Sequence, residues 1–276
     1  MKKITFLLVA FMATMFCACS SDNDNNGKDE PQKYDCKIKI HTSSDEIGLN
    51  QILSISYTLS KPATEYYMED SKGHKVYNQK ELEWKPTKLG EQILKFVASN
   101  GSEEVTEYKT INVVACDMGT GRWGNSNAYI KKCESNSLVT NSNGMLRYKL
   151  KGGERVYQFS SDKLDRGFNL FEYEYDTSIT SNLWLCLDLY MQHLDRIKEE
   201  YGEPISCTDD IYSFKRNFVN EPGDVKYEAQ RIINGSHAIL YVFKSNRTTI
   251  ECSLEKKDNS SYAFASKVLI SYKQNK

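Results

Sequence analysis

The sequence lacks the motifs typical of the common catalytic and metal-binding chemistries. It contains no His-Glu-x-x-His, Gly-x-Ser-x-Gly or phosphate-loop pattern. No Cys-x-x-Cys pair occurs either, because the cysteines after position 19 are never closer than 17 positions apart. The four histidines share no metal-ligand spacing; they are His41, His74, His193 and His237. The sequence therefore identifies no catalytic residue, no metal site and no cofactor.

An excess of charge of one sign is also missing. The 36 basic and 37 acidic residues give a net charge of −1, which argues against a nucleic-acid surface or a polybasic membrane patch. Five prolines and fifteen glycines are too few for a low-complexity chain. Eighteen tyrosines and eleven phenylalanines offer large areas for burial. We expect a folded, β-rich protein that does not bind nucleic acid.

The N-terminus carries a short apolar run. Met1-Lys2-Lys3 precedes the run Ile4–Phe16, which ends at Cys17-Ala18-Cys19. Such a run is typical of a secretory signal, since thirteen helical residues reach only about 20 Å across a ~30 Å hydrocarbon core. Its end resembles the lipobox of bacterial lipoproteins, which are cut before a cysteine that is then acylated. The resemblance implies a signal peptide over residues 1–18 and a lipid on Cys19, which follows the small Ala18.

Residues 19–33 form a polar segment without an apolar side chain after Cys19 other than Pro31. Such a segment cannot bury enough surface to offset the entropy of ordering, so we expect a tether. Asp22 and Asp24 resemble the acidic signal that sends Bacteroidetes lipoproteins to the outer face of the outer membrane. A plain solvated spacer is the alternative. The expected location is therefore the outer membrane, either at the cell surface or facing the periplasm.

Residues 34–116 show the period-two alternation of antiparallel strands. Leu53, Ile55, Tyr57 and Leu59 alternate with polar residues, and Asn100-Gly101 predicts a hairpin turn. Six or seven short strands in about 80 residues predict a β-sandwich. The stretch from Trp84 to Gly90 resembles bacterial immunoglobulin-like and PKD-type modules. The resemblance implies an immunoglobulin-like spacer, with Trp84 as a core anchor rather than a ligand platform.

Residues 117–276 differ in composition and predict an α+β domain, an antiparallel sheet with one long helix. Ser126 or Asn127 is placed to cap a short helix through Glu134. A longer helix is expected over Leu183–Tyr201, ended by Gly202 and Pro204. Its apolar stripe comprises Leu187, Tyr190, Leu194, Ile197 and Tyr201, whereas His193 is expected beside the solvated face. Strands are expected over 145–150, 156–159, 171–175, 211–215, 237–244, 248–254 and 262–272.

Both halves of this domain run from a helix into strands. Tyr157-Gln-Phe159 and Tyr241-Val-Phe243 occupy corresponding places, and the long helix ends in Tyr201-Gly-Glu-Pro204. These features resemble the tandem helix-plus-sheet repeat of β-lactamase-inhibitor-like proteins, which implies a non-enzymatic binding or assembly role. Coincidence among tyrosine-rich strands is the alternative.

Two residue sets leave room for other chemistry. Glu172 and Glu174 lie on one strand face about 7 Å apart, as glycosidase-type carboxylates can, although a solvated sheet face is the simpler interpretation. Six cysteines permit disulfides after export, in pairings that the sequence leaves open, or remain as buried free thiols. They are Cys36, Cys116, Cys133, Cys186, Cys207 and Cys252.

The leading hypothesis is a lipid-anchored cell-envelope protein with a non-catalytic binding or adhesion role. The expected partner is a protein or a glycan at the second domain. One alternative is an envelope hydrolase acting on polysaccharide or peptide, and another is a structural, fimbria-like component. A row of exposed aromatic side chains would favour glycan binding, and an exposed apolar sheet edge would favour assembly.

Overall fold

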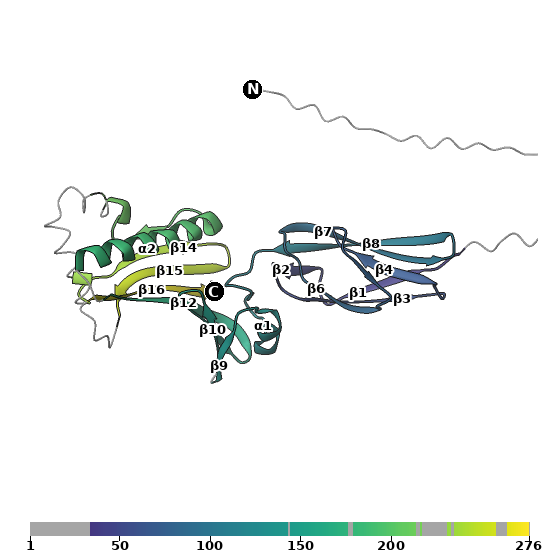
Figure 1. The fold of residues 1–276 in the computed structure, drawn as a ribbon, viewed down its shortest axis with the longest axis horizontal. Coiled ribbons are helices and arrows are strands. Elements are labelled where there is room, and N and C mark those ends of the chain that lie inside the picture. The colour runs from purple at the N-terminus through teal and green to yellow at the C-terminus, as the bar shows by residue number, and fades with distance from the viewer. Residues whose placement is uncertain are drawn as a thin grey trace, which may run out of the picture.

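The computed structural model describes residues 34–142, 144–175, 179–213, 216, 231–232, 235–257 and 264–275, with positions 174–175, 179–184 and 264–265 described by their backbone alone. Cys19 and the tether therefore lie outside the described residues. The protein is mainly β with antiparallel sheets and one long helix, which confirms the predicted fold class. We call residues 34–116 the first region and residues 117–275 the second region. They lie at opposite ends of the long axis of the molecule (Figure 1).

The first region consists of two sheets that face each other, an arrangement compatible with a β-sandwich (Figure 1). One sheet has the order β1-β3-β6 and the other β2-β8-β7-β4-β5. All neighbouring strands are antiparallel except β2 and β8, which run parallel. The strands are β1 Ile38–Thr42, β2 Glu46–Gly48, β3 Leu53–Leu59, β4 Glu65–Glu69, β5 Lys75–Tyr77, β6 Glu81–Trp84, β7 Gly90–Asn100 and β8 Glu103–Val114.

The core of the first region is filled by the alternating residues predicted from the sequence. Leu53, Ile55 and Tyr57 of β3 are buried, and Tyr57 packs edge-on against Phe96 of β7 with ring centroids 5.2 Å apart. Trp84 is buried in the same cluster, which confirms it as a core residue. The predicted hairpin joins β7 to β8, with Gly101 at a φ of +68°, a backbone conformation that favours glycine.

The second region is built on one sheet of eight strands in the order β13-β14-β15-β16-β12-β11-β10-β9. Each half of the sheet follows a helix in the chain: β9–β12 follow α1, and β13–β16 follow α2. The last strands of the two halves, β12 and β16, pair at the middle of the sheet. The elements are α1 Asn127–Cys133, β9 Leu138–Ser142, β10 Met145–Leu150, β11 Gly153–Ser160, β12 Lys163–Tyr175, α2 Ile179–Tyr201, β13 Ser206–Cys207, β14 Ile239–Lys244, β15 Thr248–Lys256 and β16 Phe264–Gln274.

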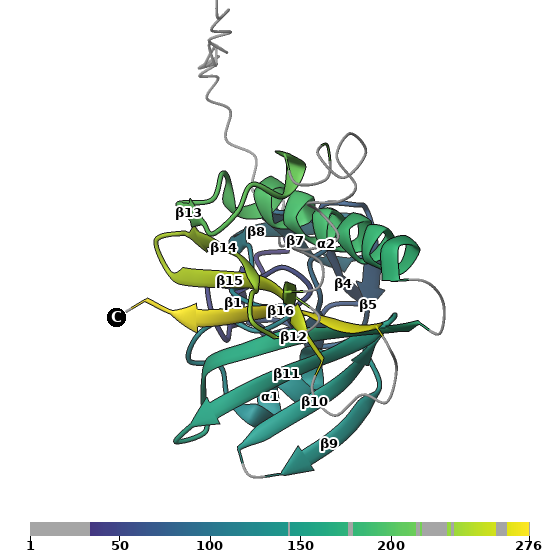
Figure 2. The ribbon, with the colours of Figure 1, turned by 90° about the vertical axis from the view of Figure 1, so that its left-hand side faces the viewer.

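Both helices lie on the same face of this sheet. The apolar stripe of α2 packs on Tyr241, Cys252 and Ile270, and Ile130 of α1 packs with Tyr148 and Tyr157. Cross-strand partners point to the same side, and the pairings from Tyr148 through Arg155 and Asn169 to Ile270 link the two patches. Figure 2 shows α2 along one side of the sheet and α1 behind β10 and β11. We call this side the covered face and the opposite side the uncovered face.

The predicted helix ends agree closely with the structure. Ser126 caps α1 through a bond from the Tyr129 amide to its side chain, and α1 ends at Cys133. The long helix α2 begins at Ile179, four residues before the predicted start, and Gly202 follows its end with a φ of +84°. The predicted strand over 211–215 was wrong, because residues 211–213 are helical. Ile211 is an apolar residue with polar neighbours. Over so short a segment this pattern fits a strand and a helix equally well, so the sequence could not distinguish the two.

Candidate functional site

The uncovered face is the first candidate for a functional surface. No described helix or strand lies on it. Its centre is an apolar stripe in which Leu170 stands opposite Leu269, and Val156 stands opposite Phe168. We call these four residues the central stripe. Val156 is buried, and the other three are half-buried.

Charged residues of both signs border the central stripe. Glu172 stands opposite Lys267 beyond one end of the stripe, and Arg166 stands opposite Lys273 beyond the other. The last pair brings two positive charges together, which an isolated sheet does not favour. A hollow of about 570 Å³ adjoins the stripe, and Leu170, Glu154 and Lys149 are among the residues that line it. An apolar centre with a charged rim is the common anatomy of a protein-binding surface.

Of the two carboxylates considered from the sequence, Glu172 alone has a described side chain. Glu172 is exposed and forms an ion pair with Lys257 at 3.1 Å. The Glu174 side chain lies outside the described residues. In the part of the chain that the structure describes, no three His, Cys, Asp or Glu side chains are grouped so that they could hold a metal ion.

The covered face contains a buried polar network that the sequence did not reveal. Glu134, at the end of α1, accepts a hydrogen bond of 2.6 Å from the Tyr157 hydroxyl and pairs with Arg155 at 3.3 Å. Arg155 also donates to Asn169 at 3.0 Å. Burial opposes ionisation of Glu134, but the Tyr157 bond and the Arg155 charge outweigh it and hold the pKa of Glu134 below its usual value. Because its polar groups bond to one another, the network binds α1 to the sheet.

His193 contradicts the expectation of a solvated side chain. It is only 8% exposed and lies against the Phe171 ring, with ring centroids 4.2 Å apart. Burial, helped by the charge of Arg196, lowers the pKa of His193 to about 4. Its position, three residues after Tyr190 and four before Ile197, places it on the apolar stripe, so the helical spacing itself could have indicated burial.

The six cysteines at positions 36 and beyond are all free in the structure. Five are buried and Cys207 is exposed. Cys186 is fully buried, and Ser266 donates a hydrogen bond to its sulfur at 3.2 Å. Burial raises the pKa of Cys186 to about 11, so this thiol is protonated and poorly nucleophilic at neutral pH.

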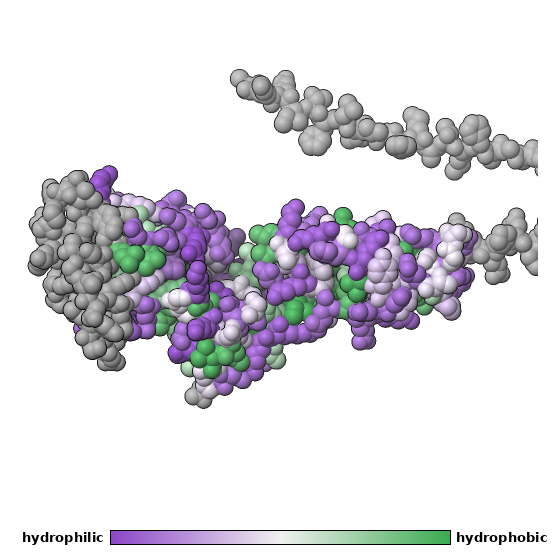
Figure 3. Space-filling model, viewed as in Figure 1, coloured by the Kyte–Doolittle hydropathy of each residue, from purple (hydrophilic) through white to green (hydrophobic). Residues whose placement is uncertain are grey.

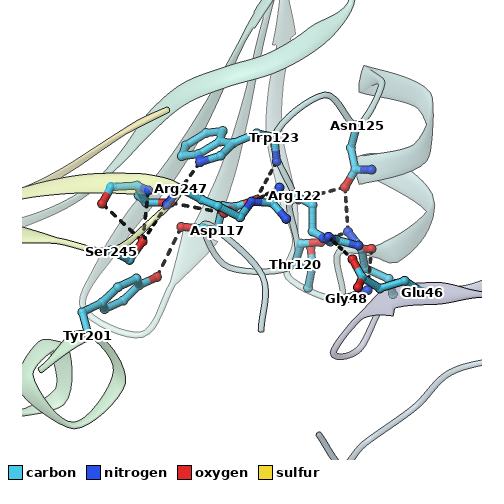
Figure 4. Close-up of polar contacts among 12 residues, drawn as sticks. Glu46, Gly48, Asp117, Thr120, Arg122, Trp123, Asn125, Tyr201, Ser245 and Arg247 are labelled. Carbon is cyan, nitrogen blue, oxygen red and sulfur yellow. Dashed lines mark hydrogen bonds and ion pairs between the residues drawn. The ribbon is translucent and has the colours of Figure 1, made fainter. Parts of the chain in front are cut away.

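The junction between the two regions is the second candidate, and Figure 4 shows its polar contacts. At its centre, the buried side chain of Asp117 accepts hydrogen bonds from the Trp123 amide at 2.8 Å and from Arg247 at 2.9 Å. Thr248 donates to the other carboxylate oxygen at 3.2 Å and accepts from the Trp123 indole at 2.9 Å. These bonds attach the start of the second region to the turn between β14 and β15.

Contacts across the junction fix the first region to the glycine-rich turn that opens the second. The Gln51 amide donates to the Thr120 carbonyl at 2.7 Å and to the Asn125 side chain at 2.6 Å. Glu46 pairs with Arg122 at 2.6 Å, and the Arg122 bond holds the pKa of Glu46 below its usual value (Figure 4). A Cβ at Gly121 would lie 2.5 Å from the buried Leu164 side chain, so a larger residue in this turn would displace that side chain.

The helix α1 adds a second set of contacts. The Tyr129 hydroxyl donates to the Ile52 carbonyl at 2.8 Å, and the Lys85 ammonium donates to the Cys133 carbonyl at 3.2 Å. Lys132 forms an ion pair with Glu83 of β6. The junction is therefore a packed, hydrogen-bonded connection. It arranges the two regions end to end and contains no paired acid and base in catalytic geometry among the residues described here.

Comparison with known proteins gives no family. No protein-family model matches the chain, and no curated protein matches its sequence. Within the described residues, no helix combines the length and apolar character needed to cross a membrane.

Proposed function

We propose that this chain is a lipid-anchored cell-envelope protein that binds a partner protein through the uncovered face of its second region. The observation that carries the proposal is the central stripe, an apolar patch bordered by charge on a sheet face with no described cover. A protein is favoured over a glycan because Phe168 is the only aromatic residue on this face in the described strands, whereas glycan platforms use rows of exposed rings.

The first region fits the role of a spacer. Tyr34, the first described residue, bonds to Glu103 and to the Pro62 carbonyl, so the chain enters at the end of the β7–β8 hairpin. The junction residues Glu46 and Gln51 lie at the opposite end (Figure 1). A tether at Cys19 would therefore hold the second region away from the membrane. The two facing sheets support the immunoglobulin-like interpretation of this spacer.

The arrangement of the second region supports a binding role over an enzymatic one. Each half supplies one helix and four strands, and the halves meet at β12 and β16. This arrangement is compatible with the tandem repeat of β-lactamase-inhibitor-like proteins. In such an arrangement the strands present a broad, continuous face, which is suited to another macromolecule rather than to a small substrate.

Photo-crosslinking in the cell envelope tests the binding surface. A photoreactive phenylalanine analogue at Phe168 should give a discrete adduct with a protein partner. The matched control carries the analogue at Tyr108, which is 63% exposed on the first region. Leu170→Asp should remove the Phe168 adduct, because it places a charge in the apolar stripe. Equal adducts at Phe168 and Tyr108, or none at either, would reject the proposed surface.

Metabolic labelling tests the anchor separately. Palmitate should label the wild-type chain, and Cys19→Ala should abolish that label, because the acylated sulfur is gone. Equal labelling of both chains would reject lipidation at Cys19. Turnover of a glycan or peptide library, lost on a single Asp or Glu substitution, would instead support the hydrolase alternative.

A further inference from the structure

One sheet edge differs from all the others in the described residues. The three sheets end in six edge strands: β1, β6, β2, β5, β13 and β9. Strands β2, β5 and β13 have three residues or fewer, while β1 carries Lys39 and β6 carries Glu81 and Glu83. Short length, charge and β-bulges protect an edge against pairing with another chain. Strand β9 is longer than these three strands and carries no charge, and its one irregularity lies at its Leu138 end.

Strand β9 is five residues long, uncharged and exposed along its whole length. Leu138 and Val139 are among the most exposed large apolar residues described, at 46% and 54%. An apolar patch is visible over the tip formed by β9 and β10 on an otherwise mainly hydrophilic surface (Figure 3). Within the described chain, β9 pairs only with β10. Its outer backbone N–H and C=O groups are thus available to another strand.

We propose that two copies of this chain pair through their β9 edges, antiparallel to each other, and continue the eight-stranded sheet from one molecule into the next. Pairing of two β9 strands places no like charges opposite each other, because β9 contains no charged residue. The contact is isologous, so it closes at two copies rather than growing into a fibre. The register between β9 and β10 shifts at the Leu138 end of the strand, and Thr140, Asn141 and Ser142 continue in regular pairing.

The geometry of the molecule favours a second copy over an unrelated strand. Two identical antiparallel edges are related by a two-fold axis perpendicular to the sheet. Figure 2 looks along the long axis of the molecule and shows β9, β10 and β11 nearly face-on, so this two-fold axis runs close to the long axis. Pairing therefore leaves both first regions on the same side of the dimer.

That orientation agrees with the place where the chain enters. Tyr34 lies at the end of the first region far from the second region, so both N-terminal segments of the dimer would leave in one direction, toward one membrane. In both ribbon views β9 is the outermost strand of its half of the sheet, and the first region does not extend as far as β9 on that side (Figures 1 and 2). The proposal uses the membrane tether of the proposed function, but it does not depend on the uncovered face.

Hydrogen exchange of the tethered chain tests the pairing. Residues 20–276 with an N-terminal hexahistidine tag are bound to phosphatidylcholine vesicles containing a nickel-chelating lipid, at sparse and at dense coverage. Amides of residues 138–142 should exchange several-fold more slowly at dense coverage, because half of them gain a cross-strand partner. Amides of β5, another edge strand, should not respond. The tag replaces the acyl chain, so a failure of lipidation does not affect this result.

Matched variants locate the contact. Val139→Lys should remove the dependence on coverage, because it places a charge on each edge, and Thr140→Lys should do the same. Ile93→Lys is the control: Ile93 is equally exposed, at 54%, but lies in β7 inside its sheet. Equal exchange at both coverages, or a dependence that survives both lysine variants of β9, would overturn the proposal. Protection that requires envelope extract would overturn it in favour of a different partner strand.

Discussion

The two regions bury their sheets in different ways. In the first region two sheets cover each other, so the apolar residues of both inner faces are satisfied within the region. In the second region α1 and α2 cover one face of a single sheet, and no described element covers the other. The difference suggests that the first region is complete as a structural unit, whereas the second has surface left for a partner.

The regions also differ in what they bury. The polar residues that the first region buries are the uncharged Gln51 and Gln92. The second region buries Asp117, Glu134 and His193. Charged and titratable groups are costly to bury unless they are paired, so substitutions and pH should affect the second region more strongly.

Glu134→Ala should produce the largest difference between the regions. Removing the carboxylate leaves Arg155 without its buried partner, and breaking a buried pair costs about 3–5 kcal/mol of unfolding free energy. The loss should appear as faster amide exchange in β10–β12 under mild denaturant, with β3 and β7 unchanged. Glu154→Ala is the control, because its pair with Arg147 lies at the surface. A similar loss in both variants would show that burial of the Glu134 network is not the cause.

Lowering the pH should loosen the second region before the first. The pKa of His193 is about 4 in the folded chain and 6.5 in the reference state, so the unfolded chain binds the proton first. The contribution of neutral His193 to the unfolding free energy is therefore complete above pH 6.5. It is lost as the pH falls toward 4, and the loss amounts to about 3 kcal/mol. His41 and His74 of the first region are exposed.

This prediction is checked by amide hydrogen exchange or denaturant unfolding of each region between pH 7 and pH 5. The window ends at pH 5 because the pKa of Glu134 lies below its usual value, so titration of Glu134 does not contribute. His193→Phe should flatten the pH dependence of the second region, because phenylalanine keeps the ring contact with Phe171 and cannot titrate. An unchanged slope in this variant would assign the effect to another group.

Gln51→Ala should loosen the junction without unfolding either region. The substitution leaves the Thr120 carbonyl and the Asn125 side chain without the amide donor, at a cost of about 1–3 kcal/mol. Small-angle scattering should show a broader distribution of interregion distances, with the melting of each sheet preserved. Gln79→Ala, on the first region away from the junction, serves as the control. An unchanged distribution in Gln51→Ala would mean that packing alone holds the junction.

Lys132→Ala should have the smallest effect. Its ion pair with Glu83 crosses the junction but is about half exposed, and exposed pairs contribute roughly 0–1 kcal/mol. Its small effect on the distance distribution should disappear at high salt, because screening weakens the pair in the wild type as well. A loss equal to that of Gln51→Ala would show that charge, rather than the buried amide, orients the regions.

The sequence by itself determined the local structure. Alternation identified β3 and the last residues of β12, and the spacing of Leu187, Tyr190 and Leu194 identified α2, because these periods record which side of an element is buried. Ser126 and Gly202 identified the helix ends through capping chemistry. The fold class followed from these elements alone.

Only the tertiary structure decided what depends on residues far apart in the chain. The pairing of Phe171 with Val268, the bonds from Gln51 to Asn125 and the Glu134–Arg155 pair join segments whose order in the sequence carries no distance information. The exposed edge of β9 arises in the same way. Whether a polar residue finds a partner, or a strand a neighbour, is decided by packing between elements rather than by the pattern within one.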